Sequence, residues 1–224
     1  MKILCISDQI DPQVYSPGIK DRFSGVDLVL CAGDLPLNYL DFIISSLNKP
    51  LLFIFGNHHT EEMRHYKKLA GISLLQQEKE KYEFPGCGAV HIGTKIKTEG
   101  DFIIAGLGGS MRYNNGSNQF TDFEMYVEIT KLLPQLLWNR IVHGRYVDIL
   151  LTHAPPRGIH DKNDRCHLGF KAYLWFMKVF KPKYLVHGHT HLYDMCETRC
   201  TKWENTMIIN AYSHYVINLD DSNG

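Results

Sequence analysis

Residues 27–34 read DLVLCAGD, a short apolar run that ends in an aspartate. Four further runs have the same form, each ending in a residue that can bind a metal: residues 2–8 (KILCISD), 51–58 (LLFIFGNH), 147–153 (VDILLTH) and 184–191 (YLVHGHTH). Short continuous apolar runs are typical of buried strands. Because ligands of open α/β sheets bind outside the carboxyl ends of the strands, the five runs predict one site at one sheet edge.

Seven polar residues follow these runs: Asp8, Asp34, Asn57, His58, His153, His189 and His191. Each alone would be interpreted as a turn, cap or core residue. Their repeated position after a strand favours a shared site instead. Two histidines two residues apart point to one side of an extended chain, so they can reach neighbouring metals, which lie ~3.5–4 Å apart in two-metal sites. Nitrogen and oxygen ligands without thiolate favour manganese, iron or zinc over copper or calcium.

The composition indicates one α/β domain over residues 1–224, with 44% hydrophobic residues and zero formal net charge. Zero charge argues against a long nucleic acid as partner. No apolar run is long enough to span a bilayer, and the first strand leaves no room for a signal peptide, so we expect a cytoplasmic protein. Cys5 and Cys31 are expected in the core, and Cys196 with Cys200 is interpreted as structural or incidental rather than a zinc site.

Strand patterns alternate with helical patterns, which predicts two mixed β-sheets packed face to face with helices outside, a four-layer α/β sandwich. Helices are expected at 39–48, 60–69, 121–142 and 169–180, and further strands at 90–92, 102–105, 206–209 and 215–217, the later ones in hairpins. Thr121 and Glu124 form a capping-box pattern, and Pro134 should kink or divide the helix that follows. The large apolar residues of 120–138 are interpreted as a face packed on the sheet.

These blocks, in this order, resemble the calcineurin-like metallophosphoesterase family, and they extend from residue 8 to residue 191. The most specific are Gly56-Asn57-His58 and Gly188-His189-Thr190-His191, and the stretch at 153–156 (HAPP) resembles the family's small phosphodiesterases. The resemblance implies a metal-dependent phosphoesterase, more typically a phosphodiesterase, that acts on a small phosphate ester.

The resemblance also implies a role for each residue. Asp8, Asp34 and His191 would hold the first of two divalent ions, most simply Mn²⁺. Asp34, Asn57, His153 and His189 would hold the second, with Asp34 bridging. A metal-bridging hydroxide would attack phosphorus, while His58 stabilises the developing charge or protonates the leaving oxygen.

Two positions depart from the family pattern. The first block should read Asp-x-His, but Ile10 stands where the histidine is expected. Water could complete the first site and leave a weaker ion, Asp11 or Gln9 could swing in, or the site could stay empty. His59 replaces a usual acidic residue that orients the catalytic histidine, and Glu61 or Glu62 could substitute for it.

Two loops are expected to shape the substrate pocket. The loop at 106–118 contains Arg112, which we predict to bind a phosphate oxygen, although a plain surface turn fits its composition equally well. The loop at 155–169 leaves directly from His153, so at least one of Arg157, His160, Asp161 and His167 should approach the metals. His160 or His167 could replace the missing ligand, although surface roles are favoured. The other histidines, which have no motif context, are interpreted as structural: His65, His91, His143, His187 and His214.

The alternative function is a non-catalytic or weakly active metal-binding scaffold of the same fold, because Ile10 cannot ligate. A nucleic-acid-binding protein would need clustered basic residues, and these are dispersed apart from residues 178–183. A homo-oligomer is left open by the sequence.

Overall fold

The computed structural model describes residues 1–58, 88–114, 116–194 and 197–219. The predicted helix at 60–69 lies outside these residues, as do His59, Glu61, Glu62 and His65. Within the described part, the strands form a five-stranded sheet of order β13-β1-β2-β3-β4, a six-stranded sheet of order β11-β12-β10-β9-β6-β5, and a small β7-β8 pair.

The first sheet contains β1 (Lys2–Ser7), β2 (Leu28–Cys31), β3 (Leu51–Phe53), β4 (Val90–His91) and β13 (Ser213–Asn218). The second contains β5 (Lys95–Glu99), β6 (Phe102–Leu107), β9 (Ile149–Thr152), β10 (Tyr184–His187), β11 (Cys200–Trp203) and β12 (Thr206–Asn210). The small pair is β7 (Ser110–Met111) with β8 (Gln119–Phe120), and the helices are α1 (Ile19–Arg22), α2 (Leu37–Leu47), α5 (Asp122–His143) and α6 (Lys171–Phe180).

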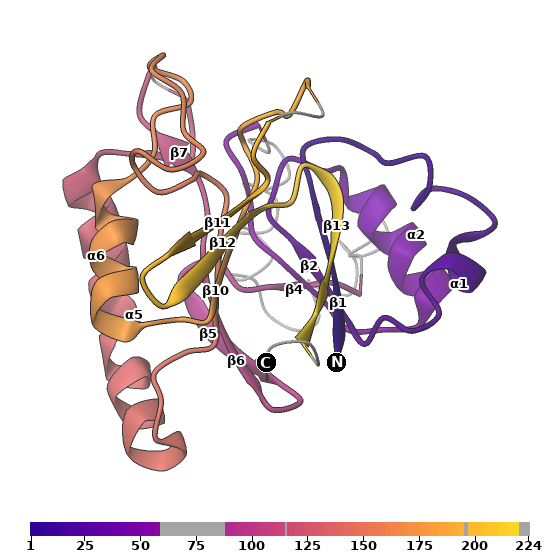
Figure 1. The fold of residues 1–224 in the computed structure, drawn as a ribbon, viewed down its shortest axis with the longest axis horizontal. Helices are drawn as coiled ribbons and strands as arrows, with labels where there is room; N and C mark the ends of the chain where they lie inside the picture. The colour runs from indigo at the N-terminus through magenta and orange to yellow at the C-terminus, as the bar shows by residue number, and fades with distance from the viewer. Residues whose placement is uncertain (59–87, 115, 195–196, 220–224) are drawn as a thin grey trace, which may run out of the picture.

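The two large sheets pack face to face, with α1 and α2 outside one and α5 and α6 outside the other (Figure 1). Alternation along β1 shows why. Ile3 and Cys5 point into the cluster between the sheets, whereas Leu4 and Ile6 point into the cluster under α1 and α2. Both faces of β1, β2, β3 and β9 are therefore buried, which explains their continuous apolar runs. The predicted four-layer sandwich of mixed sheets is confirmed.

Parallel pairing brings the carboxyl ends of the five motif strands to the same region. β1 and β2 are parallel neighbours, as are β2 and β3 in the same sheet. In the other sheet β9 and β10 are parallel neighbours. The hairpin expected for the later strands is confirmed for β12, which pairs antiparallel with β11 and also parallel with β10. It is wrong for β13, which crosses to the other sheet and pairs antiparallel with β1.

Helix α5 begins with the predicted capping box: the Thr121 side chain accepts from the Glu124 backbone, and the Glu124 carboxylate accepts from the Thr121 backbone. Of the two expectations for Pro134, a kink or a division, the division is wrong, because one helix runs from Asp122 to His143, while the kink stays a prediction. Pro134 removes the donor for the carbonyl of Thr130, and both residues are exposed, so water can satisfy that carbonyl.

The expectation for the apolar residues of 120–138 holds for only one face of α5. Met125, Ile129 and Leu136 are buried against the second sheet, but Phe123 and Trp138 are 76% and 63% exposed. The helix is apolar on both sides, so periodicity alone could not separate the covered face from the open one. None of the described helices is long and apolar enough to cross a bilayer.

Candidate metal centre

Asp8, Asp34 and His189 lie just past the ends of β1, β2 and β10, and each has a positive φ, of 62°, 54° and 66°. Residues other than glycine rarely adopt this left-handed region, which costs of order 1–3 kcal/mol where the surroundings impose it. The turns direct the three side chains back across the strand ends. Such strain concentrates at functional sites.

Two glycines allow the aspartates to approach the neighbouring strand ends. A Cβ atom on Gly56 would lie 2.1 Å from Oδ1 of Asp34, and one on Gly188 would lie 2.3 Å from Oδ2 of Asp8. Both distances are far inside van der Waals contact. The glycines of the Gly-Asn-His and Gly-His-Thr-His blocks are therefore required by the space that the two carboxylates occupy.

His153 lies at the centre of the site and is fully buried. Its Nδ1 lies 2.8 Å from the carbonyl oxygen of Ala32, which can only accept, so Nδ1 carries a hydrogen. Its Nε2 faces two oxygens, Oδ1 of Asn57 at 3.0 Å and Oδ2 of Asp34 at 3.1 Å. A neutral His153 would therefore direct a lone pair at two acceptors, an arrangement that requires a proton or a cation between them.

The pKa of His153 also shows that this position favours a positive charge. Burial opposes its protonation, but the carboxylate of Asp34 outweighs burial and raises the pKa of His153 to about 9. His189 behaves in the opposite way, since burial and the neighbouring His153 lower its pKa to about 4. A metal ion would bind the same atoms in place of the proton, because imidazole ligates in its neutral form.

His189 is held by the loop that leaves His153. Its Nε2 donates to the carbonyl oxygen of Cys166 at 2.6 Å, which leaves Nδ1 as the nitrogen with a free lone pair. Asp34, His153 and His189 each offer one ligand atom, and these three atoms lie within 4.8 Å of one another. The structure thus brings three of the predicted ligands into a group that could hold one ion, with Asn57 beside it.

Asp8 and His191 form an adjoining pair. Nε2 of His191 lies 3.8 Å from Oδ1 of Asp8, and the Asp8 Oδ2 accepts from the backbone N–H of His189 at 2.8 Å. Burial alone would raise the pKa of Asp8, but the contact with His191 and the nearby His153 lower it. Nδ1 of His191 faces the hydroxyl of Tyr193 at 2.9 Å, so its Nε2 points toward the aspartate.

Ile10 does not join this pair through any ligating atom, and its side chain is 42% exposed. Asp11 is committed elsewhere: its Oδ2 accepts from Ser213 and from Nδ1 of His214, both at 2.5 Å, and its Oδ1 accepts from the Gln13 backbone at 2.7 Å. In this structure Asp11 therefore anchors strand β13 rather than completing a metal site.

Asn57 and His58 diverge as adjacent residues should. Asn57 is buried, and its amide donates to the hydroxyl of Tyr113 at 3.2 Å, which directs its Oδ1 to His153. His58 is exposed, and its backbone N–H donates to Oδ1 of Asp34 at 3.1 Å. The backbone of His58 thereby ties the Asp34 carboxylate in position, and its imidazole lies at the rim.

Arg112 is paired with Glu124, whose two carboxylate oxygens lie 2.8 and 2.9 Å from its Nη2. The same nitrogen donates to the carbonyl of Gln119 at 3.3 Å. A phosphate oxygen would have to compete with Glu124 for this guanidinium. Substrate binding by Arg112 stays a prediction, and its observed role is to fasten the β7-β8 loop to the start of α5.

The loop at 155–169 contributes more through its backbone than through its side chains. The ring of His167 lies 5.3 Å from that of His189, and His167 is held by Asp164 at 2.8 Å. His160 is the acceptor of the Thr201 hydroxyl at 2.8 Å and donates to His187 at 2.9 Å, because His187 must donate from its other nitrogen to the Gly188 carbonyl. The expected surface role of His160 is wrong, since it belongs to this part-buried chain.

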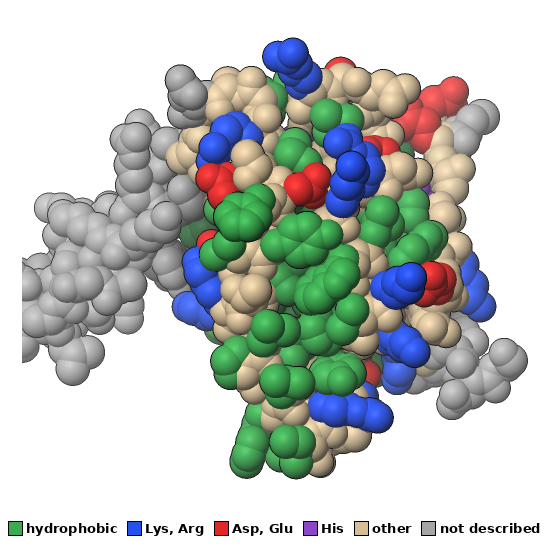
Figure 2. Space-filling view, turned by 90° about the vertical axis from the view of Figure 1, so that its left-hand side faces the viewer, with side chains coloured by type: hydrophobic (Ala, Val, Ile, Leu, Met, Phe, Trp, Pro, Cys, Tyr) green, Lys and Arg blue, Asp and Glu red, His purple; other side chains and the backbone are tan. Residues whose placement is uncertain are grey.

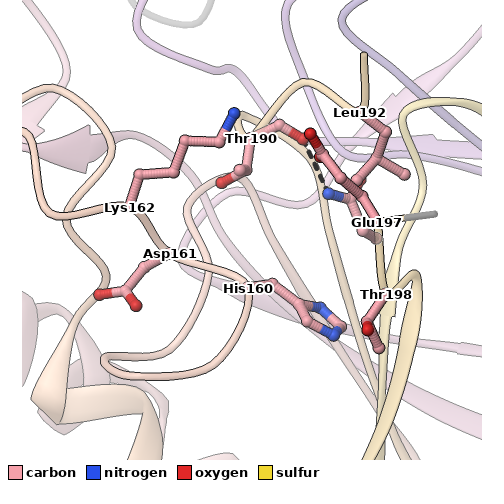
Figure 3. Close-up of a pocket in the computed structure, with 8 residues that line it drawn as sticks. His160, Asp161, Lys162, Thr190, Leu192, Glu197 and Thr198 are labelled. Atoms are coloured by element: carbon pink, nitrogen blue, oxygen red, sulfur yellow. Dashed lines mark hydrogen bonds between the residues drawn. The ribbon is translucent and has the colours of Figure 1, made fainter. Parts of the chain in front are cut away.

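A cavity of about 250 Å³ adjoins the 188–191 segment on the side of His160. Figure 3 shows Lys162, Asp161 and Thr190 around it, and the dashed line is the bond from Asn210 to the carbonyl of Thr190, of 2.7 Å. The hydroxyl of Thr190 is buried with no hydrogen-bond partner among the described residues. The remaining lining comes from His160, Leu192, Glu197 and Thr198.

Several contributors carried no sequence signal. The Cys166 carbonyl that orients His189 is a backbone group, and the tyrosines that contact Asn57 and His191 lie outside the motif blocks. A metal-binding motif specifies ligands, whereas their hydrogen-bond partners depend on loop geometry.

The fold and the set of donor atoms define the class of protein. Carboxylate oxygen, amide oxygen and imidazole nitrogen converge at the carboxyl ends of parallel strands, and their hydrogens lie on the far nitrogens, so these residues fit a divalent cation. A site of this kind, open at its rim beside His58, is that of a metal-dependent hydrolase.

Comparison with known proteins gives the family. The family model for calcineurin-like phosphoesterase matches residues 1–193, and the chain belongs to this family. The family assignment supports metal-dependent phosphoester hydrolysis. No curated protein matches the chain.

Two solved structures are similar to the chain. A crystal structure with 12% identity covers 98% of this chain and 95% of its own, with a TM-score of 0.63, which supports the fold. A second, described as a structural and functional characterization of a novel archaeal phosphodiesterase, has 14% identity, covers 98% and 94%, and has a TM-score of 0.42.

Proposed function

We propose that this protein is a two-metal phosphodiesterase that hydrolyses a small phosphate diester. The observation that carries the proposal is the convergence of Asp34, His153 and His189 within 4.8 Å, with the hydrogens of both imidazoles committed to backbone carbonyls. Ligand atoms that are fixed in this way bind a metal without first having to be reorganised.

The proposed ligand sets follow the two clusters. Asp34, Asn57, His153 and His189 would hold one ion, and Asp8, His191 and Asp34 would hold the other. Divalent cations, for which Mn²⁺ is our first choice with iron or zinc as alternatives, supply Lewis acidity that activates water and neutralises phosphoryl charge. Asp34 is the proposed bridge because a carboxylate has two oxygens that can bind separate ions; here Oδ2 faces His153, and Oδ1 is held by the His58 backbone N–H.

His58 is the proposed general acid. It is exposed at the rim, while its backbone is fixed by Asp34, so its imidazole can reach a substrate above the metals without ligating them. The leaving oxygen of a phosphodiester needs a proton as the bond to phosphorus breaks. Imidazole donates that proton effectively near neutral pH, because its unperturbed pKa is ~6.5.

Charge favours a diester over a monoester. A monoester carries about −1.5 to −2 near pH 7, whereas a diester has one ionisable oxygen and carries about −1. The guanidinium of the nearby loop, Arg112, is already neutralised by Glu124. Lys162 donates to the carbonyl of His191 at 3.2 Å and lies over the Tyr193 ring. Both cations already have partners within the protein, so neither is available to balance the second negative charge of a monoester.

The alternative is a metal-binding scaffold with weak or no turnover. The specific observation in its favour is that Ile10 supplies no ligand beside Asp8 and His191, while Asp11 is bound to Ser213 and His214. In that case the site of Asp34, Asn57, His153 and His189 would bind its ion. The site of Asp8 and His191 would bind its ion weakly or stay empty.

Hydrolysis of bis-p-nitrophenyl phosphate with Mn²⁺ tests the proposal, with p-nitrophenyl phosphate as the monoester comparison. We expect turnover that a chelator abolishes and added Mn²⁺ restores, with the diester preferred. His58→Ala should lower kcat by about 10²–10⁴-fold while the bound metal is unchanged. His143→Ala, at an exposed histidine that ends α5, is the matched control.

The outcomes separate the candidates. Folded protein that binds metal but hydrolyses neither ester with any of manganese, iron or zinc would favour the scaffold. Faster hydrolysis of the monoester would overturn the diester preference while leaving a phosphoesterase. Loss of metal from His58→Ala would make His58 a ligand rather than an acid.

A further inference from the structure

The side of α5 that faces away from the sheet is as apolar as its buried side. Figure 2 looks onto α5 and α6 and shows hydrophobic side chains gathered across this face. On α5 the exposed fractions are 76% for Phe123, 42% for Val127, 54% for Leu137, 63% for Trp138, 78% for Ile141 and 53% for Val142. We call these six residues, with Trp175 and Val179 of α6, the outer apolar face.

The two residues of α6 extend the face sideways. Trp175 and Val179 are 39% and 41% exposed and lie one turn apart on that helix. The ring of Trp175 meets that of Tyr126 edge-on, with centroids 5.7 Å apart, so the two helices present one continuous surface. Its polar neighbours on α5, such as Glu128, Lys131 and Gln135, lie along the flank.

The extent of this face matches what a stable protein interface needs. Residues of this size expose on the order of 150–250 Å² when fully open, so the observed fractions leave roughly 800 Å². The largest apolar patch of an ordinary monomer is about 300–600 Å². A standard interface buries about 800 Å² on each partner, so one partner of the same size would cover this face.

The arrangement of side chains along α5 is symmetric about Leu132. Phe123 and Ile141 are equally far from that residue, as are Val127 and Leu137. Thr130 and Pro134, each two residues from Leu132 along the helix, are exposed and have small side chains. A two-fold axis at the level of Leu132 would place Phe123 of each copy against Ile141 of the other. The small side chains of Thr130 and Pro134 would meet in the middle of the interface. Such self-complementarity defines an isologous interface.

Charge is also complementary for an antiparallel pair. The first turns of α5 carry Asp122, Glu124 and Glu128, and the last turn carries Arg140 and His143. In an antiparallel arrangement the acidic start of one helix would lie near the basic end of the other. The antiparallel helix dipoles also attract each other. Zero net charge adds no repulsion between copies.

We propose that the outer apolar face is the interface of a homodimer, in which α5 packs antiparallel on α5 of a second copy about a two-fold axis near Leu132. The partner is this chain itself, and the proposal does not depend on the chemistry of the metal centre.

Sedimentation velocity tests the oligomeric state. The wild-type protein should sediment with about twice the 25.8 kDa chain mass at micromolar concentration. Ile141→Glu should shift it to the single-chain mass, because the buried carboxylate would lack a partner. Ile141 is 78% exposed, so the variant should keep its circular dichroism spectrum. Gln135→Glu, on the exposed polar flank of the same helix, should stay dimeric.

Cysteine cross-linking tests the antiparallel register. Phe123→Cys mixed with Ile141→Cys should give a disulfide that joins positions 123 and 141, located by peptide mass spectrometry. In this register positions 123 of the two copies are about 27 Å apart, so Phe123→Cys alone should give no bond between them. A bond between two copies of position 123 would overturn the antiparallel arrangement.

Three results would overturn the dimer itself. One is a wild-type protein that stays at the single-chain mass, and another is an Ile141→Glu variant as dimeric as the wild type. The third is a monomer that co-floats with phosphatidylcholine and phosphatidylserine vesicles and loses this binding in Ile141→Glu, which would assign the face to a lipid surface instead.

Discussion

Nε2 of His189 lies 2.6 Å from the carbonyl oxygen of Cys166, and this contact fixes which nitrogen of His189 is free to bind a metal. The carbonyl can only accept, so the hydrogen lies on Nε2, and Nδ1 keeps the lone pair that can bind a metal shared with Asp34 and His153. The loop that leaves one histidine of the site thus orients another. Because the positions of the ligand atoms are fixed in this way, substitutions that shift them should change the metal affinity measurably.

Gly56→Ala tests the closeness of the Asp34 carboxylate to the third strand. The added Cβ would lie 2.1 Å from Oδ1 of Asp34, so the carboxylate must move. Displacing a ligand or its support lowers metal affinity by about 10–100-fold. We expect that loss in an Mn²⁺ titration followed by calorimetry, together with a comparable loss of esterase activity at limiting metal.

Gly18→Ala is the control for that variant, because the nearest atom to its Cβ would be 4.0 Å away and its φ is −81°. It should titrate like the wild type. A Gly56→Ala variant with wild-type affinity would mean that Asp34 adapts without cost and that its observed position is not required for binding.

Asp34→Asn should reduce the binding of both proposed ions, because Asp34 is the residue assigned to both. Asn keeps one oxygen of similar geometry but lacks the negative charge that offsets two cations. Metal analysis after dialysis should give less than one ion per chain, where the wild type holds up to two. Asp41→Asn, at an exposed position on α2, should leave the count unchanged. Full two-ion occupancy in Asp34→Asn would refute the bridging assignment.

Ile10→His should strengthen the weaker of the two ions. Ile10 is 42% exposed next to the Asp8 turn, so the substitution sacrifices little packing and adds a nitrogen where the family has one. We expect the second phase of the titration to tighten by about tenfold or more, by comparison with ligand and outer-shell losses in other sites. Ile10→Gln provides a polar control with a poorer ligand. An unchanged second phase would mean that the side chain points away from Asp8.

The sequence was sufficient for the five motif strands and for the edge where their ends meet, because buried parallel strands read as apolar runs and end at a common site. It missed β5, β7, β8 and β11, which are short or partly exposed and carry no apolar run. It could not give the orientation of the ligands. The ring positions of His153 and His189 depend on the carbonyls of Ala32 and Cys166, and backbone groups leave no mark in a sequence.

The periodicity of α5 was equally ambiguous. Both of its faces are apolar, so the sequence predicted burial where the structure exposes Phe123 and Trp138. Asp11 illustrates a third limit. A carboxylate three residues from Asp8 is a plausible substitute ligand in the sequence, but its partners come from Ser213 and His214, two hundred residues away along the chain.

Asp11→Asn distinguishes a structural from a ligating role for this carboxylate. Asp11 is 6% exposed and accepts from Ser213, His214 and the Gln13 backbone. Burial alone would raise its pKa, but the hydrogen bonds from Ser213 and His214 outweigh burial and lower it. A hydrogen bond to a charged group contributes about 1.5–3 kcal/mol, so the variant should lose roughly that free energy of unfolding at pH 7 while its metal content stays at the wild-type value.

The sign of the pH dependence follows from that lowered pKa. In the unfolded chain Asp11 titrates near ~3.9, and in the folded chain it titrates lower. Its stabilising effect is therefore fully present above pH ~4 and is lost as the pH falls through the folded pKa. Urea unfolding of wild type and Asp11→Asn should differ by a constant amount above pH ~4 and converge as the pH falls from ~4 through the folded pKa, whereas Asp21→Asn should match the wild type throughout. A gap that stays constant with pH would exclude the carboxylate charge as its cause, and loss of bound metal would make Asp11 the replacement for the ligand that is missing at Ile10.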